Sequence, residues 1–131
     1  MSQENVEVAK ASIDAWNAGD MDAWSEFLAP DVSWRVMQDW PEQGPFIGRE
    51  TVLRQARRLR DAWDADAAEP VSDFLHVSDH VVVRLAWRGR GHGPVLNMGM
   101  TCVYTVRKDK IIAFEYFWDH AQALKAVGLE E

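Results

Sequence analysis

Cysteine and long apolar segments are scarce in this sequence. Cys102 is the only cysteine among 131 residues, so the chain cannot form an internal disulfide. No apolar run approaches the roughly 18 residues of a membrane-spanning helix, and the polar N-terminal residues lack the apolar core of a signal peptide. These absences lead us to expect a cytoplasmic protein that does not enter membranes.

Basic side chains are also in the minority, with 14 lysines and arginines against 21 acidic residues and a net charge of −7. An acidic surface repels phosphate backbones, so we expect no nucleic-acid partner. The histidines and Cys102 show no metal-ligand spacing, and Gly89, Gly91 and Gly93 fall in a predicted hairpin instead of between a strand and a helix. We therefore expect no metal and no cofactor.

Tryptophan, in contrast, is abundant. Seven tryptophans occur in a chain that is 47% hydrophobic and 27% charged, a composition that fits one globular domain over residues 1–131. Tryptophan side chains bury large areas and favour sites with one apolar and one wet side. Their number indicates a small-molecule pocket, an interface or a densely packed aromatic core.

Apolar spacing along the chain predicts a consistent order of helices and strands. Val6, Ala9, Ile13 and Trp16 recur at helical intervals, whereas residues 95–106 alternate as in a strand. The predicted elements are helices at 6–16, 21–28 and 49–67, strands at 32–36, 71–77, 80–90, 95–107 and 111–118, and a short helix from 119 to 128. Consecutive hairpins predict an antiparallel sheet with the helices on one face, which is an α+β fold.

One face of the predicted strand 95–107 lacks the charged residues of a solvent-exposed sheet. This second face consists of Val95, Asn97, Gly99, Thr101, Val103 and Thr105. A face in contact with water normally carries charge, and no remaining segment is predicted to cover this one. We therefore expect a homodimer that packs sheet against sheet.

The preceding strand, 80–90, allows two registers. In the favoured register Val81, Val83, Leu85 and Trp87 face the helices, and the arginines between them face outward. In the reversed register Arg84 points into the pocket and becomes the leading anion-binding residue.

The order of elements and four sequence segments resemble the SnoaL-like, ketosteroid-isomerase-like branch of the nuclear transport factor 2-like superfamily. The segments are WNAGD at 16–20, APDV at 29–32, FIGRE at 46–50 and KIIAFEYFWD at 110–119. The resemblance implies a cystatin-like fold, in which a cone-shaped, curved antiparallel sheet with helices on one face encloses a pocket. The superfamily includes isomerases, cyclases, hydrolases, dehydratases and non-catalytic modules, so the fold alone does not assign a function.

Catalytic residues of the family carry over to this chain only in part. Ketosteroid isomerases use a helical tyrosine, a strand acid and a carboxylate base, and the resemblance places these on Ser12, Cys102 and Val36, which excludes that mechanism. SnoaL-type polyketide cyclases are similar to this chain and are thought to use an aspartate without a cofactor, for which Asp119 is the candidate. Asp119 and Gln122 also have the spacing of a helix capping box, so a structural role stays open.

We expect an apolar, aromatic-lined pocket with the loop 37–48 at its mouth. The predicted ligand-binding residues are Trp16, Trp34, Trp40, Met98, Met100, Tyr104, Phe114, Tyr116 and Trp118. Flat rings and flexible methionines suit a planar or polycyclic apolar molecule, although an aromatic core without a cavity is the alternative.

Two functions remain open from the sequence, and it does not decide whether the protein is an enzyme. The first is a cofactor-free isomerase, cyclase or lyase that acts on an apolar, polycyclic or polyketide-like carbonyl compound. In that case Asp119 is the acid–base, and Tyr104 or Tyr116 donates a hydrogen bond to the developing oxyanion. The second is a non-catalytic module that binds a small hydrophobic metabolite or assembles with partners.

Overall fold

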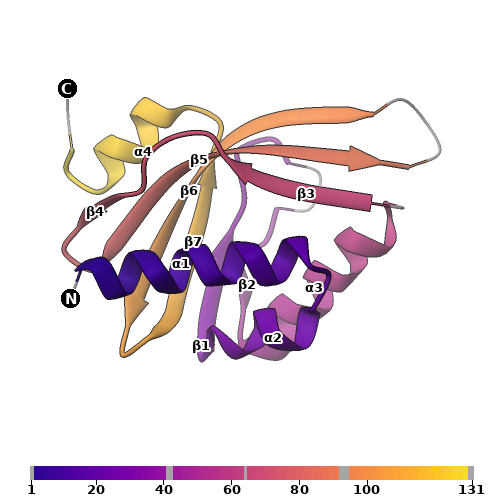
Figure 1. The fold of residues 1–131 in the computed structure, drawn as a ribbon, viewed down its shortest axis with the longest axis horizontal. Helices are drawn as coiled ribbons and strands as arrows, with labels where there is room; N and C mark the ends of the chain where they lie inside the picture. Colours follow the sequence, from indigo (N-terminus) through magenta and orange to yellow (C-terminus); the bar gives the residue numbers. More distant parts are fainter. Residues whose placement is uncertain (1, 41–42, 64, 92–94, 130–131) are drawn as a thin grey trace.

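The computed structural model describes residues 2–40, 43–63, 65–91 and 95–129. These residues form one curved, seven-stranded sheet with helices packed across it (Figure 1). The strands are β1 (Leu28–Arg35), β2 (Phe46–Ile47), β3 (Ala65–Pro70), β4 (Leu75–Val77), β5 (His80–Arg90), β6 (Leu96–Arg107) and β7 (Lys110–Phe117). Their order is β2-β1-β7-β6-β5-β3, and β4 pairs with the first residues of β5.

The predicted α+β architecture is confirmed, but the sequence pattern did not indicate every strand pairing. The β5–β6 and β6–β7 pairs are antiparallel, as expected from consecutive hairpins, whereas β1 runs parallel to β7. This parallel pairing sets Trp34 directly beside Phe114. Strand β2, which lies within the predicted loop 37–48, pairs with β1 at the edge of the sheet.

Three helices cover the inner face of the sheet: α1 (Ser2–Asn17), α2 (Met21–Glu26) and α3 (Arg49–Asp61). The chain turns after α1 at Gly19, whose φ of 75° is a conformation that favours glycine. The Asp20 carboxylate then accepts a hydrogen bond from Ala23 N at 3.0 Å and caps α2. Among the helices of the described residues, none has the length and apolar character needed to cross a membrane.

The fourth helix, α4 (His120–Ala126), packs on the opposite face of the sheet. Ala123 and Leu124 form a second buried cluster with Val82 and Val103. Side chains alternate along a strand, so these two valines point away from the main core. The expectation that no segment of this chain covers the second face was therefore wrong for the part around Val103, because the apolar side of α4 had been assigned to the same face as the other helices.

Helix α3 ends at Asp61, and the prediction that it continues to Ala67 was wrong. The segment Ala65–Pro70 is strand β3, which pairs along its whole length with residues 85–90 of β5. Alanine favours helices, but that preference is worth well under about 1 kcal/mol per residue and is outweighed by six paired strand residues. The strand predicted at 71–77 is correspondingly shorter, since only Leu75–Val77 pairs as β4.

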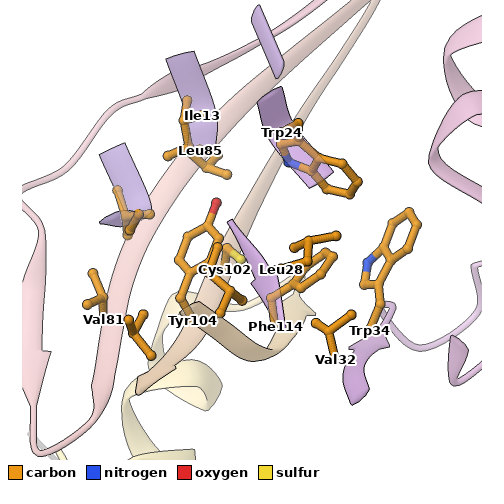
Figure 2. Close-up of a cluster of buried hydrophobic side chains, with 14 of the residues drawn as sticks. Ile13, Trp24, Leu28, Val32, Trp34, Val81, Leu85, Cys102, Tyr104 and Phe114 are labelled. Atoms are coloured by element: carbon orange, nitrogen blue, oxygen red, sulfur yellow. The ribbon is translucent and has the colours of Figure 1, made fainter. Parts of the chain in front are cut away.

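The main hydrophobic core lies between the three inner helices and the sheet. Figure 2 shows side chains from α1, α2 and strands β1, β5, β6 and β7 meeting around Cys102 and Phe114. Val81, Val83, Leu85 and Trp87 are buried in this core, so the favoured register of β5 is confirmed. The predicted turn at 91–94 lies outside the described residues apart from Gly91.

Arg84 points to the opposite face of the sheet, as the favoured register requires. Its guanidinium donates hydrogen bonds to Thr101 Oγ1 at 3.2 Å and to the Trp118 carbonyl at 2.7 Å. Thr101 belongs to the second face of β6. Arg84 therefore lies on that face and does not line the pocket between the sheet and the three inner helices.

Candidate functional site

The chain encloses an apolar pocket between the inner face of the sheet and helices α1, α2 and α3. Its wall is formed by Ser12, Ile13, Trp16, Trp24, Trp34, Val36, Met37, Trp40, Leu59, Ala68, Leu85, Trp87, Met98, Met100, Tyr104 and Tyr116. The cavity volume is about 70 Å³. An apolar cavity of roughly 150 Å³ holds one benzene molecule, so a polycyclic ligand requires side chains of this wall to move apart.

Seven of the nine ligand-binding residues predicted from the sequence lie on this wall. They are Trp16, Trp34, Trp40, Met98, Met100, Tyr104 and Tyr116. Phe114 is buried beneath the wall, where its ring stacks on that of Trp34 with centroids 5.3 Å apart. Trp118 is 41% exposed and lies outside the pocket. Ser12 and Val36, onto which the resemblance to ketosteroid isomerases carries catalytic positions, are also wall residues.

The mouth segment after β1 is tied to the end of β7 by Trp118. Trp118 Nε1 donates to the Gln38 carbonyl at 2.9 Å, and the Trp118 and Trp40 rings lie 6.3 Å apart between centroids. Met37 and Trp40 from the same segment line the pocket. The predicted position of this loop at the pocket is thus observed for its described residues, and Trp118 contributes by holding the loop.

Asp119 lies at the start of α4 and is not a wall residue. Its carboxylate accepts a hydrogen bond from Ala121 N at 2.9 Å, which is the geometry of a helix N-cap. The predicted acid–base role of Asp119 stays a prediction, because this contact describes its place in the fold and does not measure activity.

Two tyrosine hydroxyls supply polar groups inside the apolar wall. Burial raises the pKa of Tyr104 and of Tyr116 well above the ordinary phenol value, and the nearby Cys102 thiol adds to both shifts. Burial likewise raises the pKa of Cys102. Phenols and thiols are mostly protonated at neutral pH already, and these shifts strengthen that preference, so the phenols can serve as hydrogen-bond donors and the thiol is a poor nucleophile.

The indole N–H of Trp34 is a buried donor without a partner. Trp34 is only 4% exposed, and among the described residues its Nε1 is the one buried side-chain nitrogen or oxygen that makes no hydrogen bond. The ring is held by contacts with Phe46, Phe114 and Tyr116, at centroid distances of 5.5, 5.3 and 6.0 Å. Buried donors are nearly always satisfied, so this nitrogen, which is itself buried although its residue lines the pocket, is a position at which an acceptor is missing.

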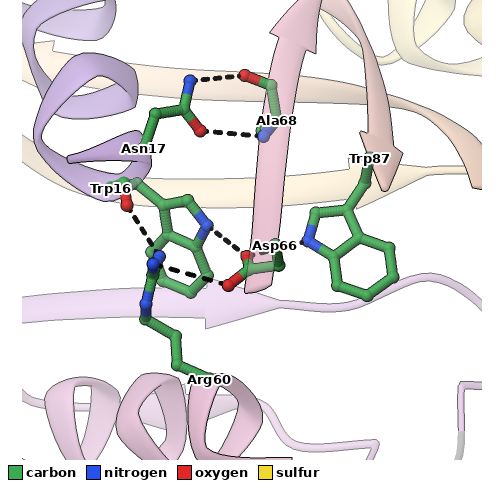
Figure 3. Close-up of polar contacts among 6 residues, drawn as sticks. All are labelled: Trp16, Asn17, Arg60, Asp66, Ala68 and Trp87. Atoms are coloured by element: carbon green, nitrogen blue, oxygen red, sulfur yellow. Dashed lines mark hydrogen bonds and ion pairs between the residues drawn. The ribbon is translucent and has the colours of Figure 1, made fainter. Parts of the chain in front are cut away.

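A buried carboxylate behind two wall residues was missed by sequence reasoning. Figure 3 shows Asp66 accepting hydrogen bonds from Trp16 Nε1 at 2.7 Å and Trp87 Nε1 at 3.1 Å, with Arg60 Nη2 at 3.5 Å from its second oxygen. Asp66 lies on β3, two residues before the wall residue Ala68, and so on the same face of that strand. Its position was hidden because this segment reads as the end of a helix.

The described residues do not suggest a metal centre. No group of three or more histidine, cysteine, aspartate or glutamate side chains within them is arranged to hold a metal ion. The wall offers aromatic faces, methionine sulfurs, hydroxyls and indole N–H groups, which suit a small apolar molecule with a few polar atoms.

Comparison with solved structures shows the fold. An NTF2-like protein of unknown function from Burkholderia pseudomallei is 21% identical, with a TM-score of 0.78 over 98% of this chain and 99% of that chain. A protein with a ketosteroid isomerase-like fold from Catenulispora acidiphila, in complex with trimethylamine, is 18% identical, with a TM-score of 0.75 over 94% and 93%. TerC, co-crystallized with polyporic acid, is 19% identical, with a TM-score of 0.76 over 95% and 97%.

Sequence comparison identifies the family. No curated protein sequence gives a significant match. The family model of the SnoaL-like domain matches residues 9–114, which is most of the chain. The match includes the second half of α1, all of α2, α3 and strands β1 to β6, and the first residues of β7. The chain therefore belongs to the SnoaL-like domain family.

Proposed function

We propose that this protein binds a flat, apolar small molecule that carries a carbonyl or similar acceptor oxygen. The observation that carries the proposal is the unpartnered N–H of Trp34, a residue of the aromatic pocket wall. This nitrogen is itself buried, so a ligand oxygen reaches it when the side chains of the wall move apart. Leaving a buried donor unsatisfied costs about 1–3 kcal/mol, and a ligand oxygen at this point would recover that cost. A polycyclic or polyketide-like carbonyl compound has both the flat apolar body and the acceptor.

Two further features of the wall support this ligand class. The hydroxyls of Tyr104 and Tyr116 add donors, because a phenol is protonated at neutral pH and burial raises the pKa of both further. The indole rings of Trp16, Trp24 and Trp34 offer flat apolar surfaces of the size of fused-ring compounds. TerC, which shares the fold, was co-crystallized with a small molecule, polyporic acid.

A matched pair of probes tests the proposal. Tetralin and 1-tetralone share one fused-ring skeleton and differ by a carbonyl oxygen, and their dissociation constants can be measured by calorimetry. We expect 1-tetralone to bind about tenfold more tightly, the worth of one buried hydrogen bond. In Trp34→Phe, which keeps an aromatic ring but removes the N–H, this preference should disappear. Trp24→Phe removes another wall indole and should preserve it.

The proposal fails if wild-type protein binds both probes equally or binds neither. Tetramethylammonium serves as a third probe, because an aromatic pocket can also hold an organic cation and one structural neighbour was solved with trimethylamine. If this cation binds more tightly than 1-tetralone, the proposed carbonyl ligand is rejected and an organic cation becomes the ligand class to test.

Turnover is the second candidate function, and it is favoured by the two protonated phenols on the wall. A cofactor-free isomerase, cyclase or lyase would use Tyr104 or Tyr116 to donate a hydrogen bond to an enolate oxygen. The same 1-tetralone probe distinguishes the two functions. An enzyme of this kind should accelerate exchange of the proton next to the carbonyl for deuterium, and Tyr104→Phe should slow that exchange. A binding module should leave the exchange rate of the probe unchanged.

A further inference from the structure

The carboxylate of Asp66 joins four elements at one end of the pocket. Trp16 comes from α1, Arg60 from the last turn of α3, Asp66 from β3 and Trp87 from β5. Both indoles donate to the same oxygen, Oδ2, at 2.7 and 3.1 Å, while Arg60 Nη2 lies 3.5 Å from Oδ1 (Figure 3). Oδ2 therefore accepts hydrogen bonds from both indoles, whereas Oδ1 faces the Arg60 guanidinium.

Arg60 also contacts Trp16 directly, at its backbone and at its ring. Its Nη1 donates to the Trp16 carbonyl at 2.7 Å, and its guanidinium carbon lies 4.6 Å from the centroid of the Trp16 ring. Next to it, the Asn17 side chain makes two hydrogen bonds of 2.8 Å with the backbone of Ala68 and ties α1 to β3. The Trp16 ring is thus fixed at its nitrogen, on one face and through its backbone.

Burial makes the contacts of Asp66 costly to lose. The side chain of Asp66 is 3% exposed and that of Arg60 is 18% exposed. A carboxylate removed from water to this extent needs hydrogen bonds and an opposite charge, and here it receives two indole donors and one guanidinium. Such a fully satisfied network fixes side-chain orientation more firmly than apolar packing alone.

We propose that Asp66 is a positioning residue, which sets the ring planes of Trp16 and Trp87 and thereby the shape of the aromatic wall that receives the ligand. Its acceptor oxygen fixes the direction of each indole N–H, and Arg60 balances its charge. Because Asp66 lies behind the wall, it acts on the ligand only through the two tryptophans. The predicted effect of Asp66 on ligand affinity rests on the proposed function. The predicted effect of Asp66 on the orientation of the two indole rings does not.

Indole proton resonances test the ring part without any ligand. The seven indole N–H signals can be separated by ¹⁵N labelling and assigned with Trp16→Phe and Trp87→Phe. In the wild type we expect these two signals to lie downfield and to exchange slowly with solvent, as charge-assisted donors do. Asp66→Asn keeps one acceptor oxygen but removes the charge, so both signals should move upfield together. Asp79→Asn, which removes a partly exposed carboxylate paired with Arg107 at 3.0 Å, should move neither.

Affinity for 1-tetralone tests the second part. Asp66→Leu removes both acceptor oxygens, and we expect its dissociation constant to rise by about tenfold or more, with a smaller rise in Asp66→Asn. If Asp66→Leu does not fold, Asp66→Asn and the two tryptophan variants carry the comparison. Unmoved indole signals in Asp66→Asn would overturn the positioning role, and so would moved signals with unchanged affinity. Failure of 1-tetralone to bind the wild type would reject the proposed function, and the indole signals alone would then decide the role of Asp66.

Discussion

At the scale of single residues, Asp119 illustrates how one carboxylate can satisfy two sequence interpretations. The resemblance to polyketide cyclases makes it an acid–base candidate, and its spacing to Gln122 makes it a helix cap. The contact with Ala121 N accounts for the cap and leaves the carboxylate outside the pocket wall. Only a change that separates capping from ionisation distinguishes the two roles.

A pair of substitutions at Asp119 makes that separation. Asp119→Ala removes the cap and should lower the free energy of unfolding by about 1 kcal/mol, whereas Asp119→Asn keeps a capping oxygen and should change it by a few tenths. Urea denaturation measures both. If Asp119 only caps α4, Asp119→Asn should also bind and turn over 1-tetralone as the wild type does. A loss of turnover in Asp119→Asn at unchanged stability would instead establish the catalytic role.

The predicted residues that lie on the pocket wall share a simple property, which is that their orientation follows from the pattern of their own strand or helix. Trp16, Met100 and Tyr104 reach the wall because period-three-to-four and period-two patterns fix which face they occupy. Asp66 and the orphan N–H of Trp34 could not be found in this way. Their roles depend on partners brought from distant parts of the chain, and no local pattern records whether such a partner is present.

At the scale of elements, the boundary between α3 and β3 shows where local propensity fails. The segment at 61–68, DAWDADAA, contains four alanines and reads as the end of a helix. Strand β5 was predicted with its observed bounds, since its apolar, valine-rich run lies between the predicted turn at 78–79 and the predicted hairpin that starts at Gly91. The edge strand beside it has little alternation of its own, and its six pairs with β5 determine its conformation.

Close packing of tryptophans against β5 gives a prediction at this scale. A Cβ added at Gly89 would overlap the Trp87 ring and lie 2.9 Å from Trp63 Cε3, within the edge-to-face pair that these two rings form. At Gly91 the nearest atom, on the same Trp63 ring, is 3.4 Å away. Gly89→Ala should therefore lower the free energy of unfolding by about 1–3 kcal/mol, the usual cost of overpacking.

The matched control is Gly91→Ala, which adds the same methyl group to the same segment. It should leave stability within about 0.5 kcal/mol of the wild type, because surface changes without a clash have small effects. Denaturant midpoints at equal slope give the comparison. Equal stability of the two variants would contradict the close approach of Trp87 and Trp63 to β5.

At the scale of the whole molecule, the second face of the sheet is divided into a covered and an uncovered part. Helix α4 buries Val82 and Val103, which removes part of the surface that the sequence assigned to a dimer. The uncovered part lies at the last residues of β5 and the first residues of β6, around Arg88, Asn97 and Gly99. Val95 beside it is 53% exposed. The homodimer remains an expectation. Because α4 covers the surface around Val103, the uncovered part is where we expect the two copies to meet.

Oligomeric state decides whether a second copy covers that surface. We expect the wild type to sediment as a dimer at concentrations of tens of micromolar. A specific interface needs about 800 Å² from each partner, and the exposed apolar side chains of Val95 and Leu96 at the start of β6 are its best candidates. Val95→Glu would then place a like charge in each copy of a chain that already carries −7, and should give a monomer. Ile47→Glu, at the opposite edge of the sheet and 55% exposed, introduces the same charge and should stay dimeric. A wild-type monomer would mean that α4 alone covers as much of this face as the protein requires, and dissociation by both variants would trace the dimer to net charge instead of this surface.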